Sequence, residues 1–177
     1  MNIFKADLET IRQRAREHMA DGAVTKAYLA DRARVIDVLN DVLATEIVCV
    51  LRYKNHHFMA SGIHAGVVAA EFLEHANEEQ AHADAVARRI TELGGNPDFD
   101  PAGLTRRSHA EYRTAKSIEA MITENLVAER VAVETYTEIV RWLGNDDPTT
   151  RRMMEGLLAA EEHHADELAN LLASLRR

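Results

Sequence analysis

Two copies of one six-residue pattern carry side chains that can share a metal ion. Residues 79–84 and residues 161–166 both read E-x-x-H-A-D. On a helix, a glutamate and a histidine three residues apart lie on one face, where a carboxylate and an imidazole can bind the same cation. The pattern therefore indicates two pairs of metal ligands.

A further glutamate precedes each pair, Glu46 before the first and Glu129 before the second, and a tyrosine follows each of them by seven residues. The predicted metal ligands are Glu46, Glu79, His82, Glu129, Glu161 and His164. Tyr53 and Tyr136 are candidate catalytic residues. They would either donate hydrogen bonds to buried carboxylates, as core tyrosines do, or supply electrons during oxygen reduction.

Long segments without glycine or proline must position these side chains. The chain of 177 residues holds only 8 glycines and 3 prolines. Their spacing predicts helices near 31–60, 65–93, 118–143 and 148–175, with a shorter amphipathic helix at 5–20. Ser117 and Asp147 are candidate N-caps, and Gly144 is a candidate helix end. Ser108 with Glu111 predicts the start of a short helix or turn.

The lengths of the connections predict the topology. The connections near residues 61–62 and 144–147 are short, so each joins antiparallel neighbours. The stretch 94–116 is long enough to cross a whole bundle. We therefore expect an all-α, up-down four-helix bundle with one long crossover over residues 31–177, preceded by an N-terminal extension over residues 1–30.

The ligand candidates lie at the middle of helix faces that are otherwise apolar. A single glutamate or histidine on a helix is usually solvated, and an isolated E-x-x-H match means little. Four carboxylates at core positions cannot all be solvated, and burying each unpaired costs several kcal/mol. We find no lysine or arginine on these faces, whereas two divalent cations would balance four glutamates with both histidines neutral.

This arrangement resembles the ferritin-like di-iron carboxylate proteins, and most closely the bacterioferritins, over residues 33–175. The resemblance implies an iron-storage and detoxification ferroxidase that oxidises Fe(II) with O2 or H2O2 and binds two irons per subunit, although Mn or Zn could also bind. By the resemblance, Glu46 and His82 bind one iron, Glu129 and His164 bind the other, and Glu79 and Glu161 bridge them.

The sequence departs from the bacterioferritins in three respects, one of which is the extra N-terminal segment of residues 1–30. Gln80 stands where that family has its haem-ligating methionine, so haem is not expected. The chain stops 13 residues after His164, without the family's short fifth helix. We therefore expect a closed homo-oligomeric shell with 12 subunits rather than 24.

A second interpretation is a di-metal peroxide-scavenging enzyme, similar to rubrerythrin or manganese catalase, without storage. Rubrerythrin is disfavoured because Ala132 stands where rubrerythrin has an additional glutamate.

A third interpretation is a DNA-compacting protein. The net charge is -8, and residues 1–22 carry four basic and four acidic side chains. We expect no nucleic-acid partner, because such a chain releases few counterions.

Other features give weaker signals. Asn125 lies one turn before Glu129 and could orient a ligating histidine. Glu71, Glu74 and Glu78 form an acidic stripe. We interpret it first as a solvated face, and the alternative is a surface on which iron mineral forms.

The single cysteine excludes an intrachain disulfide and any C-x-x-C metal site. The longest apolar run and the N-terminus fit neither a membrane span nor a signal peptide, so a cytoplasmic protein is expected.

Overall fold

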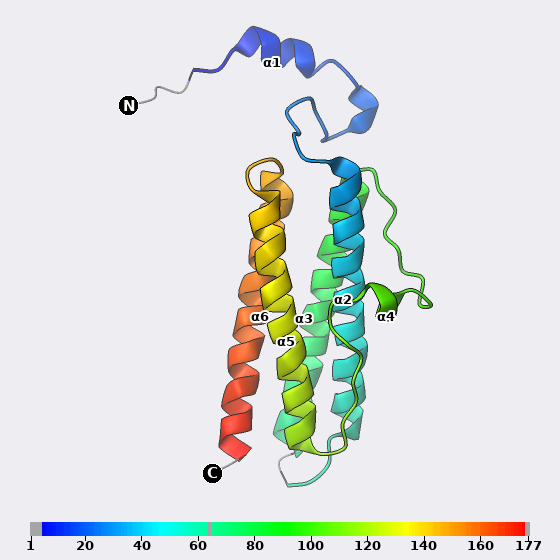
Figure 1. Cartoon of the computed structure of the whole chain (residues 1–177), viewed down its shortest axis with the longest axis vertical. Helices are drawn as coiled ribbons and strands as arrows, with labels where there is room; N and C mark the ends of the chain where they lie inside the picture. The colour runs from blue at the N-terminus through cyan, green and yellow to red at the C-terminus, as the bar shows by residue number, and fades with distance from the viewer. Residues whose placement is uncertain (1–4, 64, 176–177) are drawn as a thin grey trace.

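A computed structural model describes residues 5–63 and 65–175 of the chain. This part forms a bundle of four long helices, shown in Figure 1: α2 (Arg32–Met59), α3 (Ala65–Glu92), α5 (Ile118–Leu143) and α6 (Pro148–Leu175). The all-α four-helix fold predicted from the sequence is confirmed, and these helices begin and end within about one residue of the expected bounds. None of the described helices combines the length and apolar character that crossing a membrane requires.

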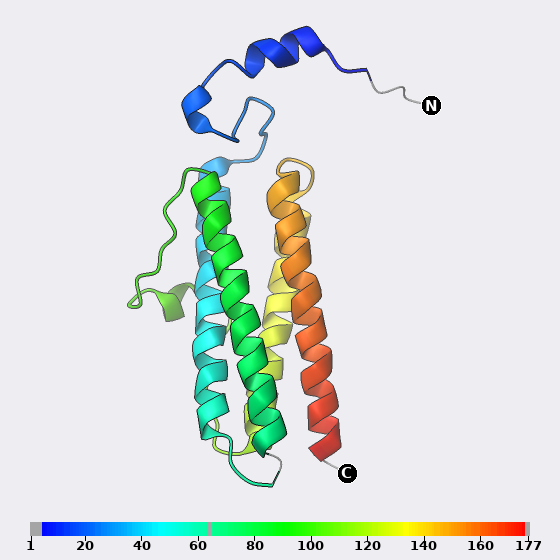
Figure 2. The same cartoon turned by 180° about the vertical axis from the view of Figure 1, so that it is seen from behind.

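The connection between α3 and α5 runs along the outside of α2 from one end of the bundle to the other (Figures 1 and 2). It carries one short helix, α4 (Leu104–Arg107). Asn40 fixes it, because its side-chain oxygen accepts from the Asp98 amide at 2.8 Å and its carbonyl accepts from Arg107 at 2.9 Å. The crossover therefore lets α3 and α5 run in the same direction, while each short connection joins antiparallel helices.

The helix ends follow local hydrogen-bond chemistry. The side chains of Ser117 and Asp147 accept from backbone amides three residues later, as N-caps do. Gly144 ends α5 with a positive φ of 51°, which is accessible to glycine. The prediction at Ser108 was wrong in one respect, since α4 lies before this residue and Ser108 is its C-cap.

The N-terminal segment lies beyond the end of the bundle where α2 begins (Figure 1). Its helix α1 (Leu8–Arg14) is shorter than the predicted helix at 5–20 and has no buried residue. His18, with φ at 50°, interrupts the helical path. Nearer the bundle, Tyr28 packs against the core and its hydroxyl donates to Asp147 Oδ2 at 3.0 Å.

Two large apolar clusters fill the bundle, one toward each end, and a third, small one joins Leu104 of α4 to Ala44 and Val48 of α2. One large cluster includes Leu39, Val86 and Met154, and the other includes Phe72 and Leu168. The six predicted ligands lie at the positions between the two large clusters along each helix, so apolar core flanks them on both sides.

Asp147 provides a test of how the last hairpin is stabilised. Its carboxylate caps α6 and also pairs at 3.1 Å with Arg89, which is nearly buried. Asp147→Ala should destabilise the fold by about 3 kcal/mol, because it removes a cap and the buried carboxylate that faces Arg89, whose remaining ion pair is with the more exposed Glu92. Asp31→Ala, which removes only the exposed cap of α2, should cost about 1 kcal/mol. Denaturant unfolding of both variants at equal protein concentration measures the difference, and equal losses would contradict this account.

Candidate metal centre

The structure brings all six predicted ligands together in the bundle interior. Each helix contributes from its middle: α2 gives Glu46, α5 gives Glu129, and α3 and α6 each give a glutamate and a histidine. Five of the six residues are at most 1% exposed, and the side chain of His82 is 15% exposed. We call these six residues the central cluster: Glu46, Glu79, His82, Glu129, Glu161 and His164.

The central cluster divides into two overlapping groups of four. In each group, one nitrogen or oxygen atom per residue lies within 4.8 Å of the others. The first group contains Glu46 and His82, and the second contains Glu129 and His164. Glu79 and Glu161 belong to both groups, which is the position that two bridging carboxylates would occupy.

The imidazole nitrogens face the carboxylates closely. His82 Nδ1 lies 3.1 Å from Glu161 Oε1 and 3.4 Å from Glu46 Oε2. His164 Nδ1 lies 3.4 Å from Glu79 Oε1. In both halves the same ring nitrogen, Nδ1, therefore points into the shared space.

Each member of the central cluster has a buried side-chain atom that makes no hydrogen bond. These atoms are Glu46 Oε2, Glu79 Oε1, His82 Nδ1, Glu129 Oε2, Glu161 Oε1 and His164 Nδ1. Buried polar atoms in folded proteins are normally paired, because desolvation without a partner is costly. Six such atoms, one per predicted ligand and close together, form a donor set of carboxylate oxygen and imidazole nitrogen that suits Fe(II), Mn(II) or Zn(II).

Two tyrosines link α2 and α5 by hydrogen bonds to glutamates of the central cluster. The hydroxyl of Tyr53 on α2 donates to Glu129 Oε1 on α5, and the hydroxyl of Tyr136 on α5 donates to Glu46 Oε1 on α2. Burial, together with the nearby carboxylates, raises the pKa of both tyrosines well above the usual value. Both hydroxyls therefore keep their protons, and the second oxygen of each glutamate makes no hydrogen bond and faces the histidine of its own group.

Glu78 holds one of the histidines from outside the central cluster. Its Oε2 lies 2.6 Å from His164 Nε2, the ring nitrogen that faces away from the shared space. Metal-binding histidines usually bond their second ring nitrogen to a carboxylate or carbonyl, which fixes the tautomer. Glu78 thus orients Nδ1 of His164 inward. From the sequence, it was interpreted first as part of a solvated acidic stripe.

The crowded carboxylates shift one another's titration. Burial raises the pKa of Glu46, and the charge of Glu79 adds to the rise. Burial and the charge of Glu46 raise the pKa of Glu161 to about 8. Burial alone would lower the pKa of His82, but the carboxylates of Glu161, Glu46 and Glu79 outweigh it and raise the pKa to about 12. Without a metal ion, protons supply the positive charge that the glutamates need.

Two expectations from the sequence need correction. Arg52 on α2 is fully buried, although the sequence reading placed no arginine on the inner faces. Asn125 does not contact a ligating histidine; its Oδ1 accepts from Arg52 Nε at 2.9 Å and lies 3.0 Å from His56 Nδ1. Arg52 also lowers the pKa of Glu129, although burial opposes the shift and His164 contributes more to lowering it. The sequence offered no signal for Arg52, because a residue directly before Tyr53 lies on a different part of the helix surface.

His75 lies one turn before Glu79 on the same face of α3. It is a second residue whose role was not predicted from the sequence. It is 1% exposed, and its ring stacks on His164 with centroids 4.2 Å apart. Its Nδ1 lies 3.1 Å from the Tyr53 hydroxyl. The corresponding position before Glu161 is Leu157, so the internal repeat gave no indication of a polar role here.

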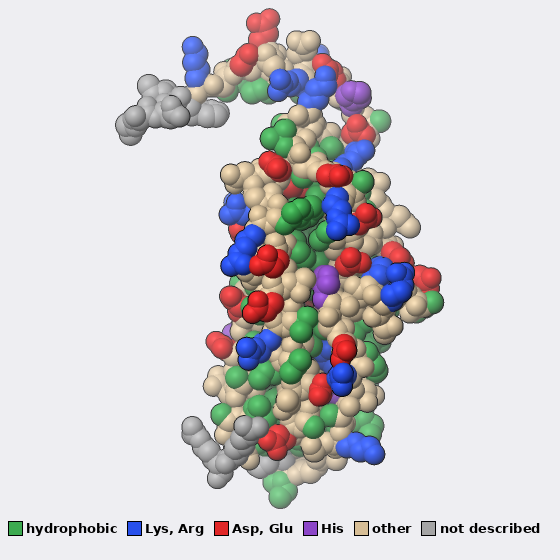
Figure 3. Space-filling view, viewed as in Figure 1, with side chains coloured by type: hydrophobic (Ala, Val, Ile, Leu, Met, Phe, Trp, Pro, Cys, Tyr) green, Lys and Arg blue, Asp and Glu red, His purple; other side chains and the backbone are tan. Residues whose placement is uncertain are grey.

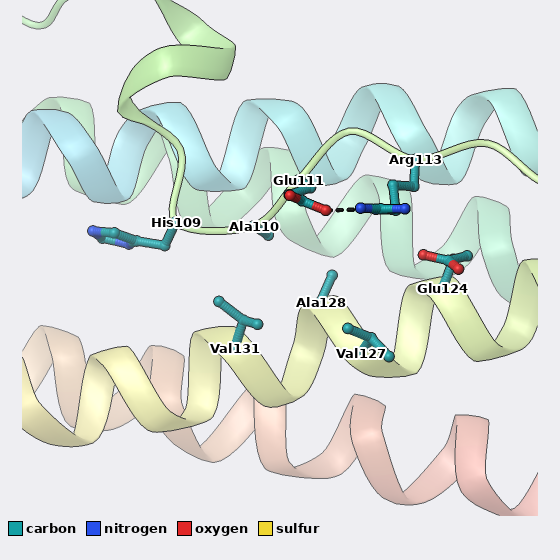
Figure 4. A pocket seen from close by; sticks show the side chains of 8 residues that line it. All are labelled: His109, Ala110, Glu111, Arg113, Glu124, Val127, Ala128 and Val131. Carbon is teal, nitrogen blue, oxygen red and sulfur yellow. Dashed lines mark hydrogen bonds and ion pairs between the residues drawn. The ribbon is translucent and has the colours of Figure 1, made fainter.

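An open pocket of about 140 Å³ lies elsewhere, between the crossover and α5 (Figure 4). Its lining includes Val127, Ala128 and the ion pair of Glu111 with Arg113, and none of the central cluster.

Comparison with known proteins gives consistent matches. A model of the ferritin-like domain family matches residues 36–177. The chain is similar to a dodecameric thioferritin, the bacterioferritin-related protein from Bacteroides fragilis, with a TM-score of 0.81 and 32% identity over 84% of this chain and 90% of that one. It is also similar to the Desulfovibrio desulfuricans bacterioferritin, whose structure has a diiron site, with a TM-score of 0.73 and 25% identity over 82% and 81%. The DNA protection during starvation protein of Pyrococcus furiosus is 31% identical over 149 residues, 80% of this chain and 78% of that protein.

The raised pKa values predict that metal binding releases protons. His82 must lose a proton before Nδ1 can bind a cation, and Glu161 is largely protonated below pH 8. Apparent affinity for Zn(II) should therefore rise by at least about tenfold per pH unit between pH 6 and 8. Calorimetry in buffers of different ionisation enthalpy measures the number of protons released. Binding that is independent of pH and of buffer would contradict the assignment of His82 and Glu161.

Proposed function

This chain belongs to the ferritin-like domain family, and from that premise we propose that its central cluster binds two iron ions and oxidises Fe(II) with O2 or H2O2. The resemblance noted in the sequence is confirmed by the family match. The observation that carries the proposal is the set of six buried atoms without hydrogen bonds, one from each predicted ligand. A storage and detoxification protein would use this reaction to convert soluble Fe(II) into Fe(III).

The donor set fits the reaction. Two Fe(II) ions give up one electron each, so together they reduce O2 to H2O2, or H2O2 to two molecules of water, with uptake of two protons. In our proposal Glu46 and His82 hold one ion, Glu129 and His164 hold the other, and Glu79 and Glu161 bind both. Two ions carry four positive charges, which balance four carboxylates when both imidazoles are neutral.

Tyr53 and Tyr136 act in this proposal as positioning residues. Each hydroxyl holds one oxygen of a terminal glutamate and leaves the other oxygen directed at the metal position. Such supporting contacts typically change metal affinity by about 10–100-fold when removed. Electron donation by either tyrosine remains a prediction from the sequence.

A closed shell of twelve copies is the assembly we propose. The support comes from the Bacteroides fragilis relative, which is dodecameric and matches over most of both chains. Storage of oxidised iron requires an enclosed volume, and symmetric closure provides one. Haem is not part of the proposal, because the exposed Gln80 offers no thioether sulfur at the position where the bacterioferritins have a haem-ligating methionine.

Binding to DNA is left out of the proposal, although some relatives are named for it. Two basic side chains near this end of the chain have acidic partners, since Lys26 pairs with Glu17 and Arg32, at the start of α2, pairs with Asp21. On the face shown in Figure 3, acidic and basic side chains are interspersed. A net charge of -8 gives little electrostatic attraction to a phosphate backbone.

Replacing a terminal ligand tests the site. Glu129→Gln should reduce Fe(II) binding from two ions to one per chain and remove most of the fast oxidation, because the second ion loses a carboxylate ligand. Glu134→Gln, an exposed change on the same helix, is the matched control and should keep both. Anaerobic titration and stopped-flow absorbance provide the measurements. Parent-like binding and rate in Glu129→Gln would show that the reaction occurs elsewhere.

The proposed assembly is tested by native mass. Purified protein should have a mass near twelve subunits and no haem absorbance, and it should not retain duplex DNA at physiological salt. A 24-subunit particle with stoichiometric haem would contradict the assembly, and DNA affinity that falls steeply with salt would contradict the excluded partner. A stable monomer would instead favour a peroxide-scavenging enzyme without storage.

A further inference from the structure

A second group of possible ligands lies between α3 and α6, next to the central cluster but sharing no residue with it. It consists of Glu71 and His75 on α3 and Glu167 on α6, and one nitrogen or oxygen atom of each lies within 4.8 Å of the others. We call these three residues the lateral cluster. None of the three was predicted as a metal ligand, and the proposed ferroxidase reaction does not use them.

The lateral cluster combines a buried ring with two accessible carboxylates. His75 is 1% exposed, whereas the side chains of Glu71 and Glu167 are 26% and 37% exposed. His75 Nε2 lies 3.0 Å from Glu167 Oε2 and 3.7 Å from Glu71 Oε1. The other oxygen of Glu167 lies 3.2 Å from the exposed His163. The two carboxylates that face His75 Nε2 are therefore themselves open to solvent.

The hydrogen bonds of Tyr53 determine which nitrogen of His75 carries a proton. The Tyr53 hydroxyl has a single hydrogen, and it donates that hydrogen to Glu129. In its contact with His75 Nδ1 at 3.1 Å, the hydroxyl oxygen must therefore accept, and Nδ1 must carry the hydrogen. In the neutral ring, Nε2 then has only a lone pair to offer.

In this tautomer, acceptor atoms of the lateral cluster face one another with no hydrogen between them. The lone pair of Nε2 faces a carboxylate oxygen at 3.0 Å, and a second carboxylate lies close by. Acceptors repel one another unless a positive charge lies between them. An N–H donated at the far side of the ring is also the usual arrangement for a histidine that binds a metal.

We propose that the lateral cluster is a binding site for a third divalent cation, held by His75 Nε2 and one carboxylate oxygen each from Glu71 and Glu167. One imidazole and two carboxylates form a mixed nitrogen and oxygen donor set that suits Zn(II), Fe(II) or Mn(II). Water completes the coordination on the open side. The site stands on its own geometry and does not require the central cluster to bind iron.

Zn(II) is the probe for the test, because it does not change oxidation state. Crystals soaked in Zn(II) should show anomalous density at His75 Nε2, and calorimetry should give three ions per chain, a count that includes the two of the proposed central site. The double variant Glu71→Gln/Glu167→Gln should bind two and lose the density at His75. The control is Glu74→Gln/Glu162→Gln, which makes the same change of charge at exposed positions on the same two helices and should bind three.

A further variant separates this proposal from the proposed function. Glu46→Gln/Glu161→Gln disrupts the central cluster but leaves the contact of Tyr53 with Glu129 intact, so the ion at His75 should remain. If the parent shows no density at His75, or if Glu71→Gln/Glu167→Gln binds as many ions as the parent, the lateral cluster is only an ion-paired histidine and the proposal fails.

Discussion

Four carboxylates cannot share the interior of an apolar bundle unless positive charge lies among them, and the rest of this structure depends on that constraint. Transferring each ionised group from water to the interior costs several kcal/mol, and neighbouring charges of one sign add to the cost. Protons meet the requirement in part, as the raised pKa values of Glu46, Glu161 and His82 show. Metal ions would meet it with more charge and with defined geometry, and each residue of the central cluster has one inward-facing atom that makes no hydrogen bond.

The same constraint explains how the helices are connected and braced. Apolar clusters on both sides of the central cluster contribute the burial that offsets the cost of the charged layer. Tyr53 and Tyr136 each link one hairpin to the other through a glutamate, so the two hairpins are held together at the charged layer as well as by the apolar core. The long crossover makes this possible, because it places α2 and α5 where their tyrosines reach each other's carboxylates.

Local chemistry explains why much of the fold and the central cluster could be predicted from the sequence. Helix bounds follow from capping residues such as Ser117 and Asp147, and E-x-x-H spacing places two ligands on one helical face. Arg52 and His75 could not be predicted in this way. Their roles depend on contacts between helices, with Asn125 on α5 and with Glu167 on α6, and no spacing within one helix encodes such a contact.

The two halves repeat in sequence but differ in their surroundings, so the two proposed metal positions are not equivalent. Glu129 lies near Arg52, and despite burial its pKa is lowered, whereas the pKa of its counterpart Glu46 is raised. His164 has Glu78 on its outer nitrogen and His75 stacked on its ring. The lowered pKa of Glu129 depends mainly on a protonated His164, whose own pKa is raised, despite burial, by the carboxylates of Glu129, Glu161 and Glu79. A cation at the Glu129 position would therefore displace a proton from His164, whereas a cation at the Glu46 position would displace protons from both His82 and Glu46.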